Sequence, residues 1–586
     1  MAEKNAPSAP AAAPPKPAGG PPPPPPPKHP GMVTCTVDGR EAVVKPGTNV
    51  IEAAKSAGVE IPYYCYHKRL SVAANCRMCL VEMSNAPGGK LMPACQMPAA
   101  EGIVVKTGTP RVKEQQRATL EFLLLNHPVD CPICDQAGEC KLQDYYMKFD
   151  LRPSRLDIPK VEKGKRLQLG PLVIIDQERC ILCTRCVRFM REVAKAPQLG
   201  VVERGNHSAI TTFPDAPLDN QYSGNVVDIC PVGALTSTDF RFRGRVWFMS
   251  AARSLCAGCA RGCNVFLDYM NDVTYRYRPR ENEAVNQEWM CDDGRLSYKP
   301  LNQERVLRAR AGRGGRELAR AEAVTQAARG MRAMAETKAL AVLFSPVASL
   351  EDLLVAALVA REALELGQVY VGGHKDGWQD DFLKRADENP NRKGLEMVAR
   401  AFGLELRPFG ELTRAIGSGQ VRGVWAVGSE IPDPAAAGLF AGLELLVCQS
   451  ANDGELARQA TVLLPASPHS EGDGTFVNFE GRAQRFELAY WPRGDSRPHW
   501  ALAQELAVAL GLSRQWQNAR EVFADLGARL GDALGDYRFD SLPSLPRRRG
   551  LLPMGAGTVD GRLPGLRERV PHDMGEDALR ALAKTS

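Results

Sequence analysis

The chain has 586 residues, which is too long for a single hydrophobic core, so we expect several domains. Its formal net charge of +6 is small for 63.8 kDa, and the basic residues form no stripe interleaved with aromatic residues, which argues against a nucleic-acid partner. The longest apolar stretch, residues 353–360, is far shorter than the roughly 18 residues that span a bilayer, so we expect no membrane span.

The 17 cysteines indicate metal binding rather than disulfides. The N-terminus shows neither the apolar core of a secretory signal nor an Arg-rich amphipathic stretch, so we expect a cytoplasmic protein whose thiols stay reduced. Fifteen cysteines fall into four spaced groups, and the other two, Cys35 and Cys448, are predicted to be small buried residues.

Residues 1–31 contain seven consecutive prolines, Pro21 to Pro27, among Ala, Gly and Lys. This composition favours extended polyproline II and cannot bury a core, so we predict a disordered arm. A ligand for a proline-binding domain is the alternative.

A folded domain is predicted from Met32 onwards. Residues 33–37 and 41–45 predict a β-hairpin, and Thr48 is the predicted N-cap of a helix over residues 50–57 that ends at Gly58. Four thiols follow with gaps of ten, two and fifteen residues: Cys65, Cys76, Cys79 and Cys95. Four thiolates on a hairpin and a helix resemble the β-grasp [2Fe–2S] ferredoxins, with a four-cysteine zinc site as the alternative.

A helix is predicted next, from Pro110 at its first position to about residue 126, with Leu120, Leu123 and Leu124 on one face. It leads into the pattern H-x3-C-x2-C-x5-C, which comprises His127, Cys131, Cys134 and Cys140. One imidazole and three thiolates suit a [4Fe–4S] cluster that is less negative than an all-cysteine one. Zinc is the rival for this group taken in isolation.

The third group is a C-x2-C-x2-C run with a remote Cys-Pro pair: Cys180, Cys183, Cys186 and Cys230. Three thiolates on one tight loop and a fourth before Pro231 predict a [4Fe–4S] site of the bacterial ferredoxin type, preceded by a strand over residues 171–176. Zinc sites more often use paired C-x2-C units. Nearby arginines would favour the reduced cluster or bind carboxylates of a partner: Arg179, Arg185, Arg188 and Arg191.

The fourth group has the wider spacing C-x2-C-x3-C-x27-C and predicts a further [4Fe–4S] site: Cys256, Cys259, Cys263 and Cys291.

Beyond residue 305 the sequence has α/β periodicity. A strand over 339–344, a helix over 349–366 capped by Ser349 and a strand over 368–371 form a βαβ unit. Apolar strands over 421–427, 443–448 and 461–464 extend it to an open, mostly parallel sheet. No Gly-rich dinucleotide motif or P-loop follows these strands, so no nucleotide site is indicated.

The order of the four groups resembles the large iron–sulfur subunit of respiratory complex I, the bacterial NADH–quinone oxidoreductase, over about residues 32–490. In that family the subunit relays electrons from the flavin-bearing NADH-oxidising subunit towards the subunits of the quinone module, and it binds neither flavin nor quinone. The resemblance implies a peripheral position on the inner face of the cytoplasmic membrane, in a proton-translocating complex. It also implies no independent catalytic residue on this chain.

The resemblance assigns each group to one cofactor. Cys65, Cys76, Cys79 and Cys95 would hold a [2Fe–2S] cluster, and three [4Fe–4S] clusters would bind to His127 with Cys131, Cys134 and Cys140, to Cys180 with Cys183, Cys186 and Cys230, and to Cys256 with Cys259, Cys263 and Cys291. The fourth set occurs in only some members of the family. We expect it to cross-link residues 256–291 rather than to carry the electron flow.

The stretch 467–485, with Glu471–Thr475 and Asn478–Arg482, resembles the molybdopterin-oxidoreductase domain that the family retains without its cofactor, so no molybdopterin is expected.

The implied fold is multidomain α+β. Its predicted parts are a proline-rich arm (1–31), a β-grasp [2Fe–2S] domain (32–109), a His-ligated [4Fe–4S] segment (110–150), a ferredoxin-like [4Fe–4S] domain (151–248), a molybdopterin-oxidoreductase-type [4Fe–4S] domain (249–305), a molybdopterin-oxidoreductase-like α/β domain (306–540) and an extended tail (541–586).

Three other families share the N-terminal motifs. An iron-only hydrogenase needs further cysteines, but only Cys448 follows Cys291. A formate-dehydrogenase-like molybdoenzyme, the main alternative, needs a Cys or selenocysteine ligand soon after Cys291 and a larger cofactor-binding body. The diaphorase subunit of NAD-reducing hydrogenases covers only about the first 245 residues.

Overall fold

The computed structural model describes residues 29–150, 152–313 and 315–540. Most of the proline-rich arm and the predicted tail lie outside this range. No helix in the described residues is long and apolar enough to cross a membrane. The described part of the chain divides into two compact units, one within residues 29–66 and 72–122 and the other within residues 67–71 and 123–540.

The first unit contains a five-stranded sheet, in the order β2-β1-β5-β3-β4, one short helix and residues 110–122 of a longer helix. The predicted hairpin is confirmed, because β1 and β2 pair antiparallel from Val33 opposite Val44. The predicted cap is wrong by one residue: the helix is capped by Asn49, whose Oδ1 accepts a hydrogen bond from the Glu52 N–H at 3.0 Å. The elements are β1 (Val33–Val37), β2 (Arg40–Val44), α1 (Val50–Ser56), β3 (Leu80–Met83), β4 (Met92–Pro93) and β5 (Val104–Lys106).

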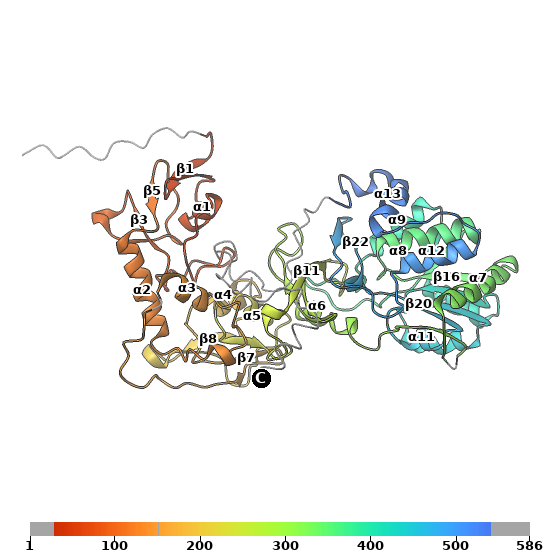
Figure 1. Cartoon of the computed structure of the whole chain (residues 1–586), viewed down its shortest axis with the longest axis horizontal. Helices are drawn as coiled ribbons and strands as arrows, with labels where there is room; N and C mark the ends of the chain where they lie inside the picture. The colour runs from red at the N-terminus through yellow and green to blue at the C-terminus, as the bar shows by residue number, and fades with distance from the viewer. Residues whose placement is uncertain (1–28, 151, 314, 541–586) are drawn as a thin grey trace, which may run out of the picture. The chain divides into compact units, whose positions relative to one another are not determined.

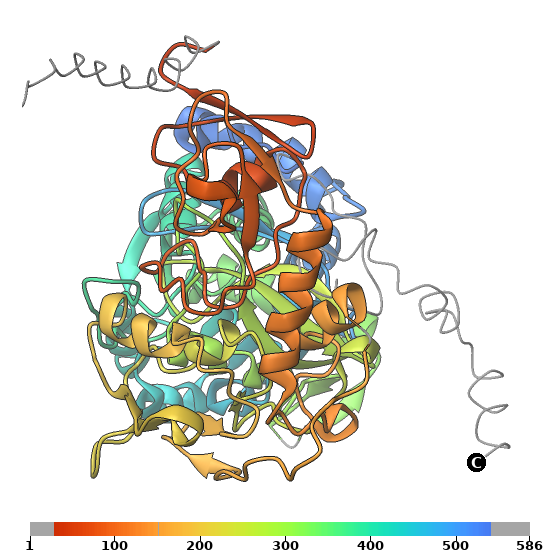
Figure 2. The same ribbon diagram turned by 90° about the vertical axis from the view of Figure 1, so that its left-hand side faces the viewer.

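Helix α2 (Pro110–Leu124) begins at the predicted proline. It is the long orange helix in Figure 2. Thr109 caps it, because its hydroxyl accepts a hydrogen bond from the Val112 N–H at 3.3 Å. Of the three leucines predicted for the buried face only Leu120 is fully buried.

The second unit begins with small elements that carry the cysteine loops. The strand predicted over 171–176 is present as β7, and residues 225–228 form a short helix. The elements are α3 (Lys141–Phe149), β6 (Leu167–Gln168), β7 (Val173–Ile175), α4 (Arg185–Glu192), β8 (Leu199–Val202), β9 (Ala209–Thr212), α5 (Asn225–Asp228), β10 (Leu235–Ser237), β11 (Ser250–Leu255), β12 (Asn264–Met270), β13 (Val273–Pro279) and α6 (Asp292–Leu296).

The rest of the second unit is built on an eight-stranded sheet in the order β15-β14-β21-β20-β19-β16-β17-β18. The six strands from β21 to β18 are parallel, as predicted, and β14 and β15 add an antiparallel edge. The strands are β14 (Ala309–Ala311), β15 (Arg316–Leu318), β16 (Leu340–Phe344), β17 (Gln368–Val371), β18 (Glu405–Pro408), β19 (Gly423–Val427), β20 (Leu445–Ser450) and β21 (Val462–Pro465).

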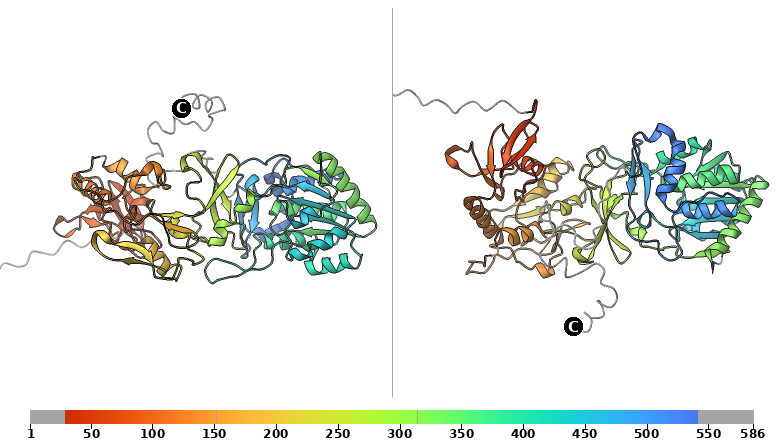
Figure 3. Two further views of the ribbon diagram at one scale, coloured as in Figure 1. Left: turned by 90° about the horizontal axis from the view of Figure 1, so that it is seen from below. Right: turned by 45° about the horizontal axis from the view of Figure 1, so that its top comes forward.

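Helices cover both faces of this sheet (Figures 1 and 3). Val342 and Phe344 of β16 pack in the core with α7 (Arg320–Glu336), α8 (Leu350–Leu358) and α12 (His499–Ala509). Ala341 and Leu343 point into the opposite core with α10 (Phe409–Gly417) and α11 (Glu455–Arg458). Burial on both faces explains why the strands are continuous apolar runs in the sequence. The other elements are α9 (Arg392–Ala401), β22 (Gly474–Val477), β23 (Ala483–Phe486) and α13 (Ala519–Leu526).

Helix α8 starts at Ser349 as predicted, with a capping box between Ser349 and Asp352. The α-helix is shorter than expected because a π-helical turn over Val359–Ala363 follows Leu358, with the Leu364 N–H donating to the Val359 carbonyl at 3.1 Å.

Candidate iron–sulfur sites

The first site lies in the first unit, and its four predicted thiols come together. The Cys76 side chain is hydrogen-bonded to Cys65, and that of Cys79 to Cys95. The Ala94 N–H donates to the Cys79 carbonyl at 3.0 Å, which joins the two ends of the β3–β4 hairpin beside the sulfurs. Cys35 of β1 is buried in the core of this sheet, as predicted.

The second site gathers Cys131, Cys134 and Cys140, whose thiols influence one another electrostatically. His127 is half-buried at the start of the same loop, and Asp130, Arg179 and Lys160 influence its imidazole electrostatically. Its ligation of iron stays a prediction. The ring is suited to the role, because its Nδ1 accepts a hydrogen bond from the Val129 N–H at 3.1 Å, which leaves Nε2 for a metal. Burial lowers the pKa of His127 to about 4, so the imidazole is neutral at pH 7.

We expect His127→Cys to keep a second cluster but to lower its midpoint potential. A fourth thiolate adds one negative charge, which disfavours the reduced cluster. An EPR-monitored redox titration of the reconstituted protein tests this. His207→Cys, on an exposed turn of the same unit, is the matched control and should leave the potential unchanged. An unchanged midpoint with full iron in His127→Cys would show that His127 is not a ligand.

The third site is the best formed, because Cys180, Cys183, Cys186 and Cys230 all line one small cavity. Burial raises the pKa of Cys180 to about 12 and that of Cys183 to about 11, so these thiols would be protonated at neutral pH unless a metal ion stabilised the thiolate. The Leu182 N–H donates to the Cys180 sulfur at 3.4 Å, the kind of contact that tunes cluster potentials.

The ligand loop of the third site has two strained residues. Leu182 and Thr184, on either side of Cys183, have φ values of 52° and 58°, in the left-handed region that costs an ordinary residue roughly 1–2 kcal/mol. Arg77 in the first site and Val129 in the second have similar values. Such strain clusters where a site needs a special backbone, which supports metal binding by these loops.

The arginines of the third site serve the fold rather than a partner surface. Arg179 forms a hydrogen-bonded pair with Asp130, with Nε to Oδ1 at 3.0 Å. Arg185 donates to the Ile229 carbonyl at 3.1 Å, and Arg188 donates to the Cys183 carbonyl at 3.2 Å. Only Arg191 is largely exposed, so the alternative of partner carboxylates is wrong for the other three.

The fourth site brings together the predicted Cys256, Cys259, Cys263 and Cys291, which are all buried and influence one another electrostatically. Gly294 separates two of the sulfurs: a Cβ at this position would lie 3.0 Å from the Cys256 sulfur and 3.2 Å from that of Cys291. The Gly294 N–H donates to Cys291 at 3.3 Å, and the Gly258 N–H donates to Cys256 at 3.4 Å. The C-x27-C spacing does not indicate that a glycine is needed at position 294 to leave room for these two sulfurs.

Within the described residues, no three His, Cys, Asp or Glu side chains converge as ligands of a single metal ion. The ligands of a cluster are divided among its iron atoms, at most two to each, so three of them do not converge on one point as the ligands of a single ion do. The shared cavity of the third site and the mutual electrostatic contacts of the thiols are therefore the features that support these predicted sites.

The second and third sites are directly connected. The Lys141 N–H, next to Cys140, donates to the carbonyl of Pro231, next to Cys230, at 3.0 Å. Gly233 lies against the second site, since a Cβ there would come within 2.3 Å of the Cys134 sulfur. This contact explains the glycine in the Cys230-Pro-Val-Gly segment.

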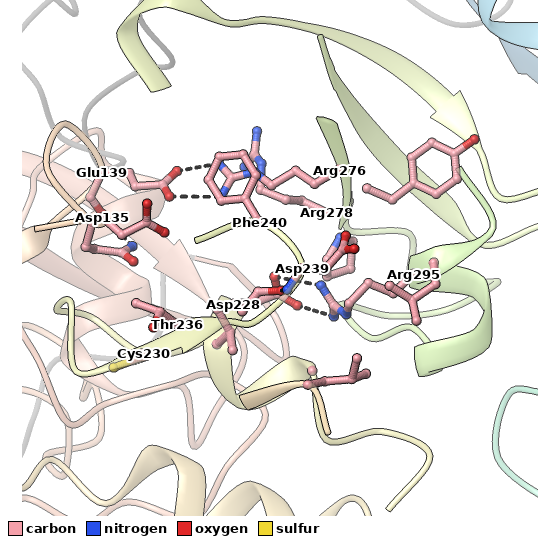
Figure 4. Close-up of a pocket in the computed structure, with 18 of the residues that line it drawn as sticks. Asp135, Glu139, Asp228, Cys230, Thr236, Asp239, Phe240, Arg276, Arg278 and Arg295 are labelled. Carbon is pink, nitrogen blue, oxygen red and sulfur yellow. Dashed lines mark hydrogen bonds and ion pairs between the residues drawn. The ribbon is translucent and has the colours of Figure 1, made fainter. Parts of the chain in front are cut away.

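The third and fourth sites are also connected. Asn225 exchanges hydrogen bonds with Met290, at 2.8 and 3.1 Å. Arg295 pairs with Asp228 at 3.1 Å, and Arg276 pairs with Glu139 at 3.1 and 2.8 Å, both on the wall of a cavity between the loops of the second, third and fourth sites (Figure 4).

A further cavity, of about 610 Å³, lies at the carboxyl ends of the parallel strands, where open α/β sheets bind ligands. We call it the large cavity. It borders the fourth site at Gly258 and Ser297. Its ionisable lining residues are Asp293, Asp352, Glu388, Glu430, Asp473, Lys384, His374, His469 and His499. Five carboxylates against one lysine do not suit a phosphate-bearing pterin cofactor.

Family models match four parts of the chain. They describe a 2Fe-2S iron-sulfur cluster binding domain (residues 31–110), an NADH-ubiquinone oxidoreductase-G iron-sulfur binding region (116–155), a NADH-quinone oxidoreductase subunit 3 ferredoxin-like domain (170–236) and a molybdopterin oxidoreductase domain (315–509). Their order confirms the predicted fold class. The G subunit of the NADH-quinone oxidoreductase of Rickettsia bellii is 44% identical over 275 residues, which is 47% of this chain and 40% of the relative.

Over the matched residues the chain is similar to the large iron–sulfur subunits of NADH-quinone oxidoreductases. A mitochondrial NADH dehydrogenase [ubiquinone] iron-sulfur protein 1 of Solanum tuberosum is 45% identical over 46% of this chain and 36% of the relative. The matched part thus spans less than half the length of these two relatives. An NAD+-reducing [NiFe]-hydrogenase structure matches 36% of this chain and 91% of its own, at 30% identity with a TM-score of 0.33.

Proposed function

We propose that this protein is the electron-relay subunit of an NADH-quinone oxidoreductase, and that it passes electrons through one [2Fe–2S] and three [4Fe–4S] clusters from a flavin-bearing subunit towards quinone. The observation that carries the proposal is the contiguity of the predicted ligand sets: the second and third sites share a backbone hydrogen bond between Lys141 and Pro231, which are adjacent to predicted ligands. Electron relay needs such close, buried centres. When bound, the clusters supply one-electron chemistry, and the chain's residues hold them and exclude water.

Partner docking is supported by exposed apolar side chains around the second site. Val129, Ile133, Phe242 and Phe248 are between 53% and 64% exposed. Arg245 connects the segment that contains Phe242 and Phe248 to the ligand loop, because its side chain donates a hydrogen bond to the Cys134 carbonyl at 2.7 Å. Large exposed apolar residues grouped around a redox centre favour a protein partner. We propose that neighbouring subunits of the complex bind here and that the complex places the chain at the inner face of the membrane.

Metal analysis tests the proposed cofactors. The full chain, reconstituted with iron and sulfide, should hold about 14 iron atoms, two from the binuclear cluster and twelve from three tetranuclear ones, and no molybdenum. Stoichiometric zinc in place of iron would contradict the relay.

The isolated chain should oxidise neither NADH nor formate, and its clusters should be reduced by NADH only after the flavoprotein partner is added. The acidic lining of the large cavity supports the absence of molybdopterin. Formate oxidation with bound molybdenum would instead establish the molybdoenzyme alternative.

A further inference from the structure

Residues 374–391, which connect β17 to α9, lie against the ligand loop of the fourth site; we call them the connecting segment. The Ala260 N–H donates to the Asp387 carbonyl at 2.8 Å, and Arg261 donates to the Leu383 carbonyl at 3.1 Å. Part of the α/β domain is therefore anchored next to Cys259 and Cys263.

The connecting segment places one buried cation beside these thiols. The Lys384 side chain is 3% exposed, and its Nζ lies 3.5 Å from the carbonyl of Gly258, the residue before Cys259. The Lys384 ammonium also interacts electrostatically with Cys259 and Cys291. We propose that Lys384 raises the reduction potential of the fourth cluster and that Glu388 limits this effect. The inference rests on the proposed binding of a cluster at the fourth site.

The charge of Lys384 has a clear source of stabilisation. Burial disfavours the ammonium, but the hydrogen bond from Nζ to Glu388 Oε1 at 3.0 Å holds the pKa of Lys384 above its ordinary value. Asp293 lies further away, at 3.8 Å, and its side chain is 47% exposed, so solvent screens it more strongly.

The effect on the cluster follows from electrostatics. A cubane held by four thiolates is negatively charged, and reduction adds another electron, so a buried cation stabilises the reduced state more than the oxidised one. Glu388 acts in the opposite direction because it places a negative charge beside the ammonium. Removing the charge of Lys384 and removing that of Glu388 should therefore shift the reduction potential of the fourth cluster in opposite directions.

The test is an EPR-monitored redox titration of the fourth cluster in the full reconstituted chain. Lys384→Gln should reduce the ratio of reduced to oxidised cluster at the wild-type midpoint about tenfold, which is 59 mV for a one-electron couple. Glu388→Gln should shift the midpoint in the opposite direction. Lys375→Gln, which removes an exposed charge from the same segment, is the matched control and should change nothing.

Opposite shifts of the midpoint potential in the two variants would establish the electrostatic role. If the two residues served only packing, their replacement would lower the iron content, and the direction of any potential shift would not follow the charge that was removed. Shifts in the same direction, or unchanged midpoints with full iron, would overturn it. If Lys384→Gln fails to bind iron, the Glu388→Gln variant alone tests the proposal. Its midpoint potential should rise, and an unchanged or lowered midpoint in this variant overturns the proposal. A wild-type chain without iron at the fourth site would refute the proposed cluster itself, while iron at the other sites would still support the relay.

Discussion

Replacing Cys183 with alanine is expected to abolish electron transfer from NADH to quinone in the assembled complex. The Cys183 sulfur lines the same cavity as Cys180, Cys186 and Cys230, and two left-handed residues flank it. Without this ligand the loop keeps its backbone strain and loses the metal binding that offsets it. Changes in residues that only support metal ligands already cost roughly 10–100-fold, so turnover should fall by more than about a hundredfold.

Cys448→Ala provides the matched control for Cys183→Ala. Cys448 is completely buried in β20, outside every ligand set, so the same change removes the same atom from a core without removing a ligand. It should leave iron content and turnover per assembled complex unchanged. Equal losses of turnover in both variants would show that Cys183 acts through packing.

Cys256→Ala should behave differently from Cys183→Ala if the fourth cluster is structural. Cys291 lies in the core of the third site, and the residues around it bond to Asn225. Because metal–thiolate binding energy is also folding energy, losing this cluster should lower the yield of assembled complex. Turnover per assembled complex should stay near the wild-type value. Normal assembly with lost turnover would place the fourth cluster in the relay.

Arg276→Met is expected to destabilise the second unit by about 3–5 kcal/mol, the usual cost of breaking a buried ion pair from one side. Arg276 of β13 binds both oxygens of Glu139, and its Nε donates to Asp268 at 2.8 Å. In the variant, the fully buried Asp268 keeps its ion pair with Arg278. The Glu139 carboxylate, however, loses the guanidinium of Arg276 that pairs with it (Figure 4).

The midpoint of thermal unfolding and the iron content of the second cluster measure this effect. Both should fall, because Glu139 precedes the ligand Cys140. Arg204→Met, on an exposed turn of the same unit, is the control and should leave both unchanged. A wild-type unfolding midpoint in Arg276→Met would show that the pair contributes little.

The sequence by itself predicted which thiols come together at the first, third and fourth sites, because short Cys spacings place most of them on one loop and the family resemblance supplies the remote cysteine of each set. It also determined the parallel sheet, since strands such as Leu340–Phe344, buried on both faces, are apolar at every position. The sequence placed two helix boundaries wrongly. Thr48 and Asn49 are both able to cap α1, and the structure uses Asn49. Helix α8 ends earlier than predicted, at a π-helical turn.

Only the tertiary structure decided which loops meet. The contact of Gly233 with Cys134, the pairing of Arg276 with Glu139 and the approach of Lys384 to Gly258 each join residues about 100 or more positions apart. No local pattern encodes such pairs, because their geometry depends on how separately folded segments pack. For the same reason the sequence left open that Arg179, Arg185 and Arg188 bind carboxylates of a partner, whereas in the structure they are buried and bond to the chain's own loops.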